Sequence, residues 1–185
     1  MASVVSPKTV TYEEWLTMPV AQDGREEVVN GEIRFMPPNK TPHPYVEARL
    51  VAGLVRQLDE SRYYVLSGGF GLVIREEPLS CRNPDVVVFD RATVVEKDGY
   101  FRSPPQLAIE ILSPTETRRM TAEKLRDYES IGIPEVWLVS PEAATVEVLL
   151  LEDGRLRRSA ILAEGVLKPR ELPGVELDIA KIWPD

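Results

Sequence analysis

Hydrophobic residues recur at helical spacing in two long segments of the chain. The spacing predicts one amphipathic helix from Pro44 to about Glu60 and a second over Thr117–Ile131, where Gly132 suits the C-terminal cap. The apolar face of the first helix consists of Leu50, Val51, Leu54, Val55 and Leu58. Both segments therefore have one face that must pack against another element.

Shorter apolar runs, bounded by turn residues, predict strands around the second helix. The runs are Tyr63–Ile74, interrupted or bent at Gly68–Gly71, a strand that Asp85 opens, Leu107–Leu112, and Glu135–Val139. In Leu107–Leu112 the residues on both faces are apolar, which is typical of a central strand buried on both sides.

Further elements are predicted at both ends of this core. Thr11 and Glu14 have the spacing of a capping box at the start of a short helix. Glu27–Phe35 forms a predicted hairpin around Asn30-Gly31, and Thr145–Leu151 with Arg155–Leu162 forms a predicted antiparallel pair. The order is thus helix, three strands, helix, strand, with antiparallel strand additions at both ends, which predicts an α/β or α+β fold with helices packed on a sheet.

Length and composition set the broad class of the protein. With 185 residues, 43% of them hydrophobic, we expect one domain over residues 1–185, with residues 1–10 as a loose arm. No run approaches the roughly 18 apolar residues of a membrane helix. The first twenty residues lack a signal pattern, so we expect a soluble cytoplasmic protein that does not bind a membrane. The single cysteine, Cys81, excludes a disulfide framework and a thiolate metal site.

The formal net charge of −8 bears on possible partners. An acidic surface repels phosphates at long range, which argues against a protein that binds nucleic acid without selectivity. A local cationic groove remains compatible with this charge. Arg118 and Arg119 are ordinary solvated charges or contacts to a phosphate backbone.

Lys124 interrupts the apolar stripe of the second long helix. At about 100° per residue it lies between Met120 and Tyr128, close to Ile131, whereas Glu123 points away from this stripe. Either its ammonium points inward toward an acidic partner, or it extends past its neighbours to solvent. Periodicity alone leaves both interpretations open.

Glu47 poses the same question on the first helix. It lies near the centre of the apolar face, between positions that Leu54 and Leu58 occupy about two and three turns later. A buried carboxylate there needs a cation or several hydrogen-bond donors. The alternative is that Glu47, one turn from the helix start, lies at the rim and interacts with the helix dipole.

Two carboxylates belong to consecutive predicted core strands. Glu110 lies within a strand that is otherwise apolar, and Asp85 opens the strand before it, although Asn83-Pro84-Asp85 is also ordinary turn chemistry. Two carboxylates brought close together raise one another's pKa, and a divalent cation removes that conflict. Together with Lys124, these residues lead to the hypothesis of a metal-dependent site.

Other candidate sites have less support. His43, the only histidine, is predicted in a proline-rich loop, and no nucleophile elbow accompanies it, which argues against a Ser-His-Asp triad. A small-molecule hydrolase would therefore lack a nucleophile–base pair. Gly68–Gly71 does not match a dinucleotide or phosphate-binding loop and more simply allows a strand to bend or pack closely.

These residues resemble the PD-(D/E)XK nuclease superfamily, and within it the Uma-type putative restriction endonucleases. Pro84-Asp85, Glu110 and the helix that carries Lys124 match the core motif. Further sequence segments that resemble this family are Glu27–Glu32, Glu110–Thr115, Lys124–Val139 and Leu172–Leu177. The resemblance therefore extends from about Thr11 to Trp183.

The resemblance implies a restriction-endonuclease-like core and a divalent cation, Mg²⁺ or alternatively Mn²⁺, held by Asp85 and Glu110. Glu47 would be the first-helix acid of the superfamily, and Glu27 matches a glutamate of the N-terminal hairpin. The acid-X-lysine signature would place lysine at position 112, where this chain has Leu112. The resemblance implies that Lys124 supplies the lysine from the following helix.

The resulting hypothesis is metal-assisted hydrolysis of DNA phosphodiesters, with Asp85, Glu110, Lys124 and Glu47 as the site. The alternative is a catalytically inactive nuclease fold that serves as a binding or assembly module, which the acidic surface and Leu112 favour. We also expect a homodimer, because the antiparallel tail leaves an edge strand to cover and Trp15, Ile182 and Trp183 are predicted to be exposed.

Overall fold

The computed structural model describes residues 9–19, 25–36 and 38–184. Its centre is a six-stranded sheet with the strand order β12-β11-β10-β9-β6-β3. These strands are β3 (Tyr63–Ser67), β6 (Val86–Asp90), β9 (Leu107–Ile111), β10 (Glu135–Ser140), β11 (Thr145–Glu152) and β12 (Arg155–Leu162). β9 and β10 run parallel, and the other neighbours are antiparallel. The mixed α+β fold expected from the sequence is confirmed.

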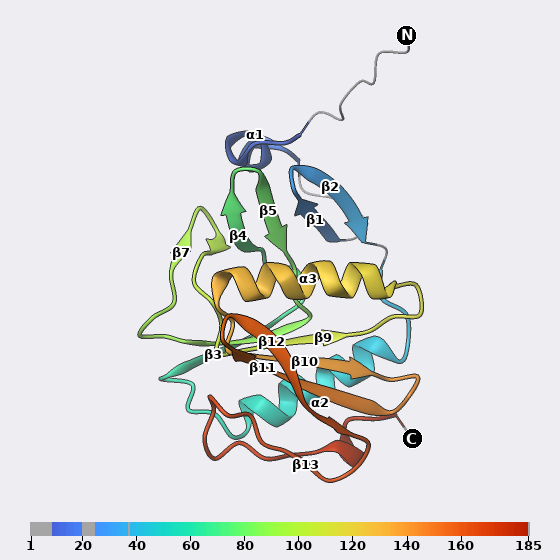
Figure 1. The fold of residues 1–185 in the computed structure, drawn as a ribbon. Coiled ribbons are helices and arrows are strands. Elements are labelled where there is room, and N and C mark those ends of the chain that lie inside the picture. The colour runs from blue at the N-terminus through green and yellow to red at the C-terminus, as the bar shows by residue number, and fades with distance from the viewer. Residues whose placement is uncertain (1–8, 20–24, 37, 185) are drawn as a thin grey trace.

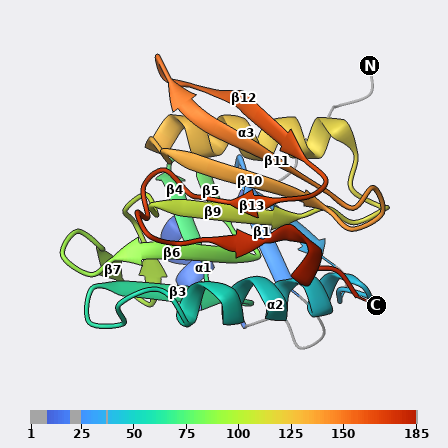
Figure 2. The ribbon, with the colours of Figure 1, turned by 90° about the horizontal axis from the view of Figure 1, so that it is seen from below.

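Two helices cover the opposite faces of this sheet. α2 (His43–Val55) lies on one face and α3 (Arg118–Ile131) on the other, as Figures 1 and 2 show. Ile109 and Ile111 of β9 pack in the core on the α2 side, whereas Ala108 packs on the α3 side. Because side chains alternate along a strand, Glu110 also faces α3. All five residues of β9 are buried, as predicted for a central strand.

A second, smaller sheet lies on the far side of α3 (Figure 1). Its strand order is β2-β1-β5-β4-β8-β7. The strands are β1 (Arg25–Val29), β2 (Glu32–Met36), β4 (Leu72–Glu76), β5 (Leu79–Arg82), β7 (Glu96–Lys97) and β8 (Tyr100–Phe101), and α1 (Tyr12–Thr17) precedes them. The C-terminal elements β13 (Val166–Leu167), β14 (Leu177–Asp178) and η1 (Ile179–Lys181) pack on the α2 side of the central sheet.

The prediction that Tyr63–Ile74 is a single strand, interrupted or bent, is wrong. The segment forms two strands, β3 and β4, which belong to different sheets. The chain passes between the sheets at Gly68 and Gly69, which both have positive φ, a conformation that glycine adopts without steric cost. At Gly71 an added Cβ would lie 2.5 Å from the Tyr100 ring, so this glycine also allows close packing.

The two long helices differ from their predicted bounds by different amounts. α3 begins after Thr117, whose hydroxyl accepts from the Met120 amide, and it ends at Gly132 in the left-handed conformation, as predicted. α2 begins one residue earlier than predicted, so the prediction that His43 lies in a loop is wrong. α2 also ends at Val55 rather than near Glu60, because the Asp59 carboxylate accepts from the Ser61 amide and forms a local turn that competes with the helix.

Local motifs near the N-terminus form as the sequence predicts. Thr11 and Glu14 exchange both hydrogen bonds of the capping box. Asn30 and Gly31 both have positive φ, as a type I′ turn requires, and they join β1 to β2. Residues 1–8 of the predicted loose arm lie outside the described part of the chain.

Three residues that were expected to be exposed are not. Ile182 is buried in the core on the α2 side, Trp183 packs against the same core, and Trp15 packs against the core of the smaller sheet. The part of the homodimer argument that depended on their exposure is wrong, and the dimer itself stays a prediction. Among the described residues, no helix has the length and apolar character needed to cross a bilayer.

Candidate active site

The register of β6 and β9 brings the two predicted acids together. Val86 pairs with Ile109, so the same antiparallel register places Asp85, one residue earlier, opposite Glu110. Directly opposed residues on antiparallel strands point to the same face of the sheet. Both residues are buried; Glu110 contacts side chains of α3, whereas Asp85 lies against His43 at the start of α2.

Asp85 is held by contacts from two directions. Its Oδ2 accepts a hydrogen bond of 2.8 Å from the Ile111 amide and lies 3.2 Å from Nε2 of His43. Burial alone would raise the pKa of Asp85, but His43, Lys124 and the Ile111 amide together lower it below its usual value. Asp85 is therefore the acid of the pair that ionises first.

Glu110 binds two side chains of α3. Lys124 Nζ donates to Oε2 at 2.6 Å, and the Tyr128 hydroxyl donates to Oε1. Lys124 and Tyr128 are four residues apart, so they lie on one face of the helix. Lys124 is 7% exposed, which rules out the alternative that its ammonium extends to solvent.

The charges around Glu110 and Lys124 shift both pKa values upward. Burial raises the pKa of Glu110, Lys124 opposes this shift, and the negative charges of Asp85 and Glu27 add to it. Burial would lower the pKa of Lys124, but the acids Glu110, Glu27 and Glu116 raise it above its usual value. Lys124 therefore stays protonated at neutral pH, beside a carboxyl that is harder to ionise than Asp85.

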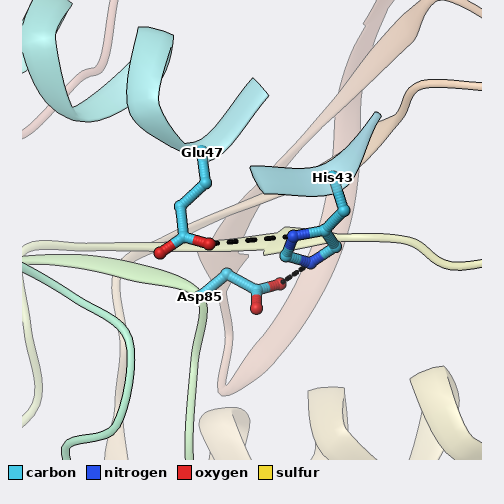
Figure 3. A group of neighbouring side chains, drawn as sticks. All are labelled: His43, Glu47 and Asp85. Atoms are coloured by element: carbon cyan, nitrogen blue, oxygen red, sulfur yellow. Dashed lines mark ion pairs between the residues drawn. The ribbon is translucent and has the colours of Figure 1, made fainter. Parts of the chain in front are cut away.

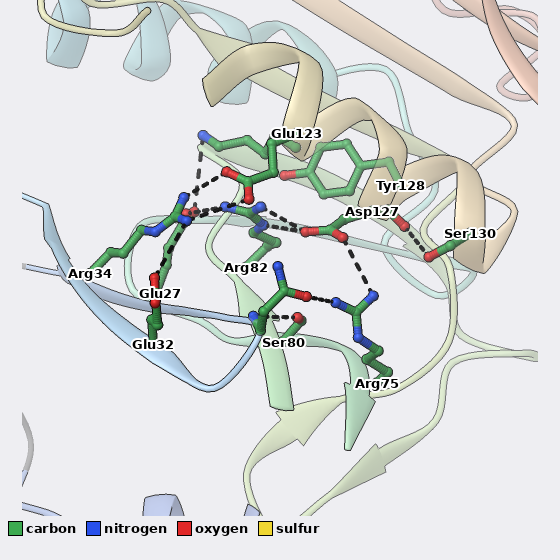
Figure 4. Close-up of polar contacts among 12 residues, drawn as sticks. Glu27, Glu32, Arg34, Arg75, Ser80, Arg82, Glu123, Asp127, Tyr128 and Ser130 are labelled. Carbon is green, nitrogen blue, oxygen red and sulfur yellow. Dashed lines mark hydrogen bonds and ion pairs between the residues drawn. The ribbon is translucent and has the colours of Figure 1, made fainter. Parts of the chain in front are cut away.

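The smaller sheet contributes a second set of buried charges to the site. Glu27 of β1 accepts from Arg82 Nη1 at 2.9 Å and from the Asn83 amide at 3.2 Å, and it lies 4.0 Å from Lys124 Nζ. Arg82 lies between Glu27 and Asp127 of α3, to which its Nε donates at 2.7 Å (Figure 4). These contacts fix the segment that leads into Asp85, so the hairpin glutamate has a positioning role.

On the other side of Asp85 lies a group of three possible metal ligands. The His43 ring faces both Asp85 and Glu47 (Figure 3), with Nδ1 3.7 Å from Oε2 of Glu47. One ligand atom from each of these residues lies within 4.8 Å of the other two. Glu47 is partly buried, and the added Cβ of a residue at position 68 would lie 3.7 Å from its Oε1. Glu47 therefore faces the site and is more than a rim residue of the helix.

The site encloses a cavity of about 30 Å³. This volume holds one water molecule or ion, since a water needs roughly 10–15 Å³ of such space. The described residues that line it include four carboxylates, those of Glu27, Asp85, Glu110 and Glu116, but only one lysine and one histidine. Carboxylate oxygens are the ligands that Mg²⁺ and Mn²⁺ prefer, so the donor set fits a divalent cation.

Position 112 does not contribute a charge to the site. Leu112 packs in the apolar core on the α3 side. The ammonium at Glu110 comes instead from Lys124, fourteen positions further along the chain. The carboxylate of Glu110 is thus paired with a lysine from the helix and not with one from its own strand.

Sequence reasoning missed three residues of the site. The sequence presents His43 only as a candidate triad member, although its i,i+4 spacing to Glu47 indicates that the two side chains share a helix face. Asp127 shares the helix face of Lys124 three residues on, and this position could also have indicated burial. Nothing in the local sequence indicates that Arg82 is buried, because its two partners lie 45 and 55 positions away.

Comparisons with known proteins identify the fold and the family of this chain. The structure is similar to the "crystal structure of a putative nuclease belonging to DUF820 from Anabaena variabilis ATCC 29413", with 18% sequence identity and a TM-score of 0.76. The match covers 94% of this chain and 97% of that one, and at this identity it shows a shared fold. The comparison with curated proteins gave no match. A family model, Uma2, described as "Putative restriction endonuclease", matches residues 11–180, and the chain therefore belongs to the Uma2 family.

Proposed function

We propose that this chain is a single-domain, metal-dependent endonuclease that hydrolyses phosphodiester bonds in DNA. The observation that carries the proposal is the convergence of Asp85, Glu110 and Lys124 on one small cavity lined by an excess of carboxylates. Membership of a family described as restriction endonucleases supports the same reaction class. Asp85 and Glu110 would hold the cation, Mg²⁺ or Mn²⁺, and Glu47 would be a further acid beside it.

Both proposed ligands are oriented before any cation binds. The Ile111 amide fixes Asp85, while Lys124 and Tyr128 fix Glu110. Each carboxylate oxygen has two lone pairs, so a hydrogen-bonded oxygen retains one for a cation. A bound divalent cation supplies Lewis acidity, which polarises a phosphoryl oxygen and lowers the pKa of a coordinated water.

Lys124 has the properties required of the positive group in this reaction. Its raised pKa keeps it charged at neutral pH, and its three N–H donors exceed the single hydrogen bond that it makes to Glu110. In the proposed mechanism it orients the attacking water and offsets the negative charge that develops on the phosphoryl group. Arg118 and Arg119, exposed in the first turn of α3, are proposed contacts to the DNA backbone.

The experiment compares wild type with Asp85→Asn, Glu110→Gln and Lys124→Met on supercoiled plasmid and linear DNA, with Mg²⁺, Mn²⁺ or EDTA. Each change removes one charge at nearly constant side-chain size. We expect every variant to lose at least about a hundredfold of the cleavage rate, the scale of losing one preorganised electrostatic group. Glu147→Gln, which alters a half-buried carboxylate on β11 in an ion pair with Arg158, is the matched control and should cleave like wild type.

Circular dichroism and melting curves must show that each variant is folded. Cleavage that survives all three site changes, or that is unaffected by EDTA, would refute the proposal. A wild type that neither cleaves DNA nor binds Mg²⁺ or Mn²⁺ in calorimetry would establish the alternative, a nuclease fold used as a binding module.

A further inference from the structure

His43 has an environment that the proposed reaction does not explain. It is the first residue of α2, and it is 5% exposed. Its ring faces two carboxylates, with Nε2 3.2 Å from Asp85 and Nδ1 3.7 Å from Glu47 (Figure 3). Within the described part of the chain, the buried Nδ1 makes no hydrogen bond.

A buried ring nitrogen without a hydrogen bond calls for an explanation, since most buried polar groups have a partner. The distance of 3.7 Å from Nδ1 to Glu47 is too long for a hydrogen bond but suits two ligands of one ion. Ligands at about 2.0–2.2 Å from a metal stand roughly 3–4 Å apart, depending on the coordination angle. His43, Glu47 and Asp85 each offer one ligand atom, and these three atoms lie within 4.8 Å of one another. This separation is close to that range.

The ligand types indicate which cation would bind. Mg²⁺ takes oxygen ligands and is rarely bound by imidazole, whereas imidazole suits transition metals, with affinity rising from Mn²⁺ toward Cu²⁺. Two carboxylates with one histidine resemble in composition the mixed sites of such metals. A site of oxygen ligands alone would not need a buried histidine.

We propose that His43 is a metal ligand, and that with Glu47 and Asp85 it forms a site that selects divalent transition-metal ions over Mg²⁺. The inference deepens the proposed function, on which it rests, because Asp85 is common to this site and to the pair that it forms with Glu110. His43 is thus a specificity-determining residue for the cation. The competing role is an imidazole that bridges the two acids without touching a metal.

The test uses the full, untagged chain and Mn²⁺ alone as the probe. Because the chain has one histidine, labelling with ¹⁵N-histidine marks His43 without any substitution. Pulsed electron paramagnetic resonance of bound Mn²⁺ should show coupling to ¹⁴N, which changes to ¹⁵N coupling in the labelled protein. This measurement does not depend on activity or on a variant that folds.

A binding series tests selectivity. We expect wild type to bind Mn²⁺ about tenfold or more tightly than Mg²⁺. His43→Gln replaces the imidazole with an amide oxygen, and it should lose more Mn²⁺ affinity than the roughly 10–100-fold typical of changes outside the ligand shell. The Mg²⁺ affinity of this variant should change by less than its Mn²⁺ affinity, so that the ratio of Mn²⁺ affinity to Mg²⁺ affinity approaches one. Glu147→Gln controls for weak binding to surface acids and should keep the wild-type ratio.

The outcomes separate this inference from the proposed function. Bound Mn²⁺ without nitrogen coupling, or an unchanged Mn²⁺-to-Mg²⁺ ratio in His43→Gln, would overturn the ligand role while metal-dependent cleavage stands. Nitrogen coupling in a protein that cleaves no DNA would support the site and refute the nuclease. Absence of saturable Mn²⁺ and Mg²⁺ binding in wild type would overturn both.

Discussion

Replacing Lys124 by methionine tests the buried ion pair at the centre of the site. Methionine preserves most of the length and packing of the side chain but removes the ammonium. Among the described residues, Glu110, which is 2% exposed, then keeps only the Tyr128 hydroxyl as a side-chain donor. Without a metal, the folded protein must either bury a poorly compensated carboxylate or protonate it.

The expected loss is large compared with the whole stability of a domain. Removing one partner of a buried ion pair typically costs about 3–5 kcal/mol. The 2.6 Å bond and the burial of both groups place this pair in that class. A typical domain unfolds at a cost of about 5–15 kcal/mol, so the variant should remain folded only by a reduced margin. Adding Glu110→Gln to Lys124→Met removes the stranded charge and should restore most of the loss.

The loss should depend on pH with a defined sign. Burial and the charges of Asp85 and Glu27 raise the pKa of Glu110, and Lys124 is the main group that opposes the shift. In Lys124→Met, the folded state therefore keeps a proton that the unfolded chain loses above about pH 4.5, the usual glutamate value. Stability then falls as pH rises from that value to the raised pKa, by about 1.4 kcal/mol per pH unit.

Urea unfolding in EDTA at pH 5 and pH 8 measures these quantities for wild type, Lys124→Met and the double variant. The difference in unfolding free energy between wild type and Lys124→Met should be larger at pH 8. A loss below about 1 kcal/mol at pH 8 would refute the buried pair, since exposed pairs contribute only about 0–1 kcal/mol. A difference that is equal at both pH values would refute the titration of Glu110.

Two further predictions concern the smaller sheet. Arg82→Met leaves Glu27 and Asp127 buried without their shared cation, and it should lower the free energy of unfolding in urea by about 3–5 kcal/mol. Arg82→Lys keeps the charge but not the several N–H donors of the guanidinium, and it should lower that free energy by less. Burial raises the pKa of the Cys81 thiol to about 12, so a thiol reagent at pH 8 should modify it only after unfolding, and rapid labelling of the folded protein would contradict the packing of β5.

The sequence was sufficient for the elements that have strong periodicity. The apolar stripe of α3 predicted both its bounds and the inward position of Lys124, because a helix of fourteen residues repeats its pattern several times. Glu110 was identifiable because a charge within a run of buried strand residues is energetically unfavourable without a partner. Periodicity gives the direction of a side chain, however, and not the identity of the group that it meets.

The parts that sequence reasoning missed depend on contacts between distant segments. β7 and β8 have two residues each, too few to show the alternation of a strand. The pairing of His43 with Asp85 spans 42 positions and requires the start of α2 to meet the end of the β5–β6 connection. A one-residue difference in the helix start was enough to assign His43 to a loop.

Because the lysine that pairs with Glu110 comes from the helix and not from the strand, the site depends on how α3 docks. A lysine at position 112 would be fixed to Glu110 by the backbone of β9 alone, whereas Lys124 can reach Glu110 only if the helix lies in one register against the sheet. Tyr128 provides that register, because it lies one turn further on and donates to the same carboxylate. Asp127, the residue before Tyr128, accepts a hydrogen bond from Arg82 of the smaller sheet. The contacts that hold the two sheets around α3 are therefore the same ones that place the ammonium, so the geometry of the site and the packing of the fold are set together.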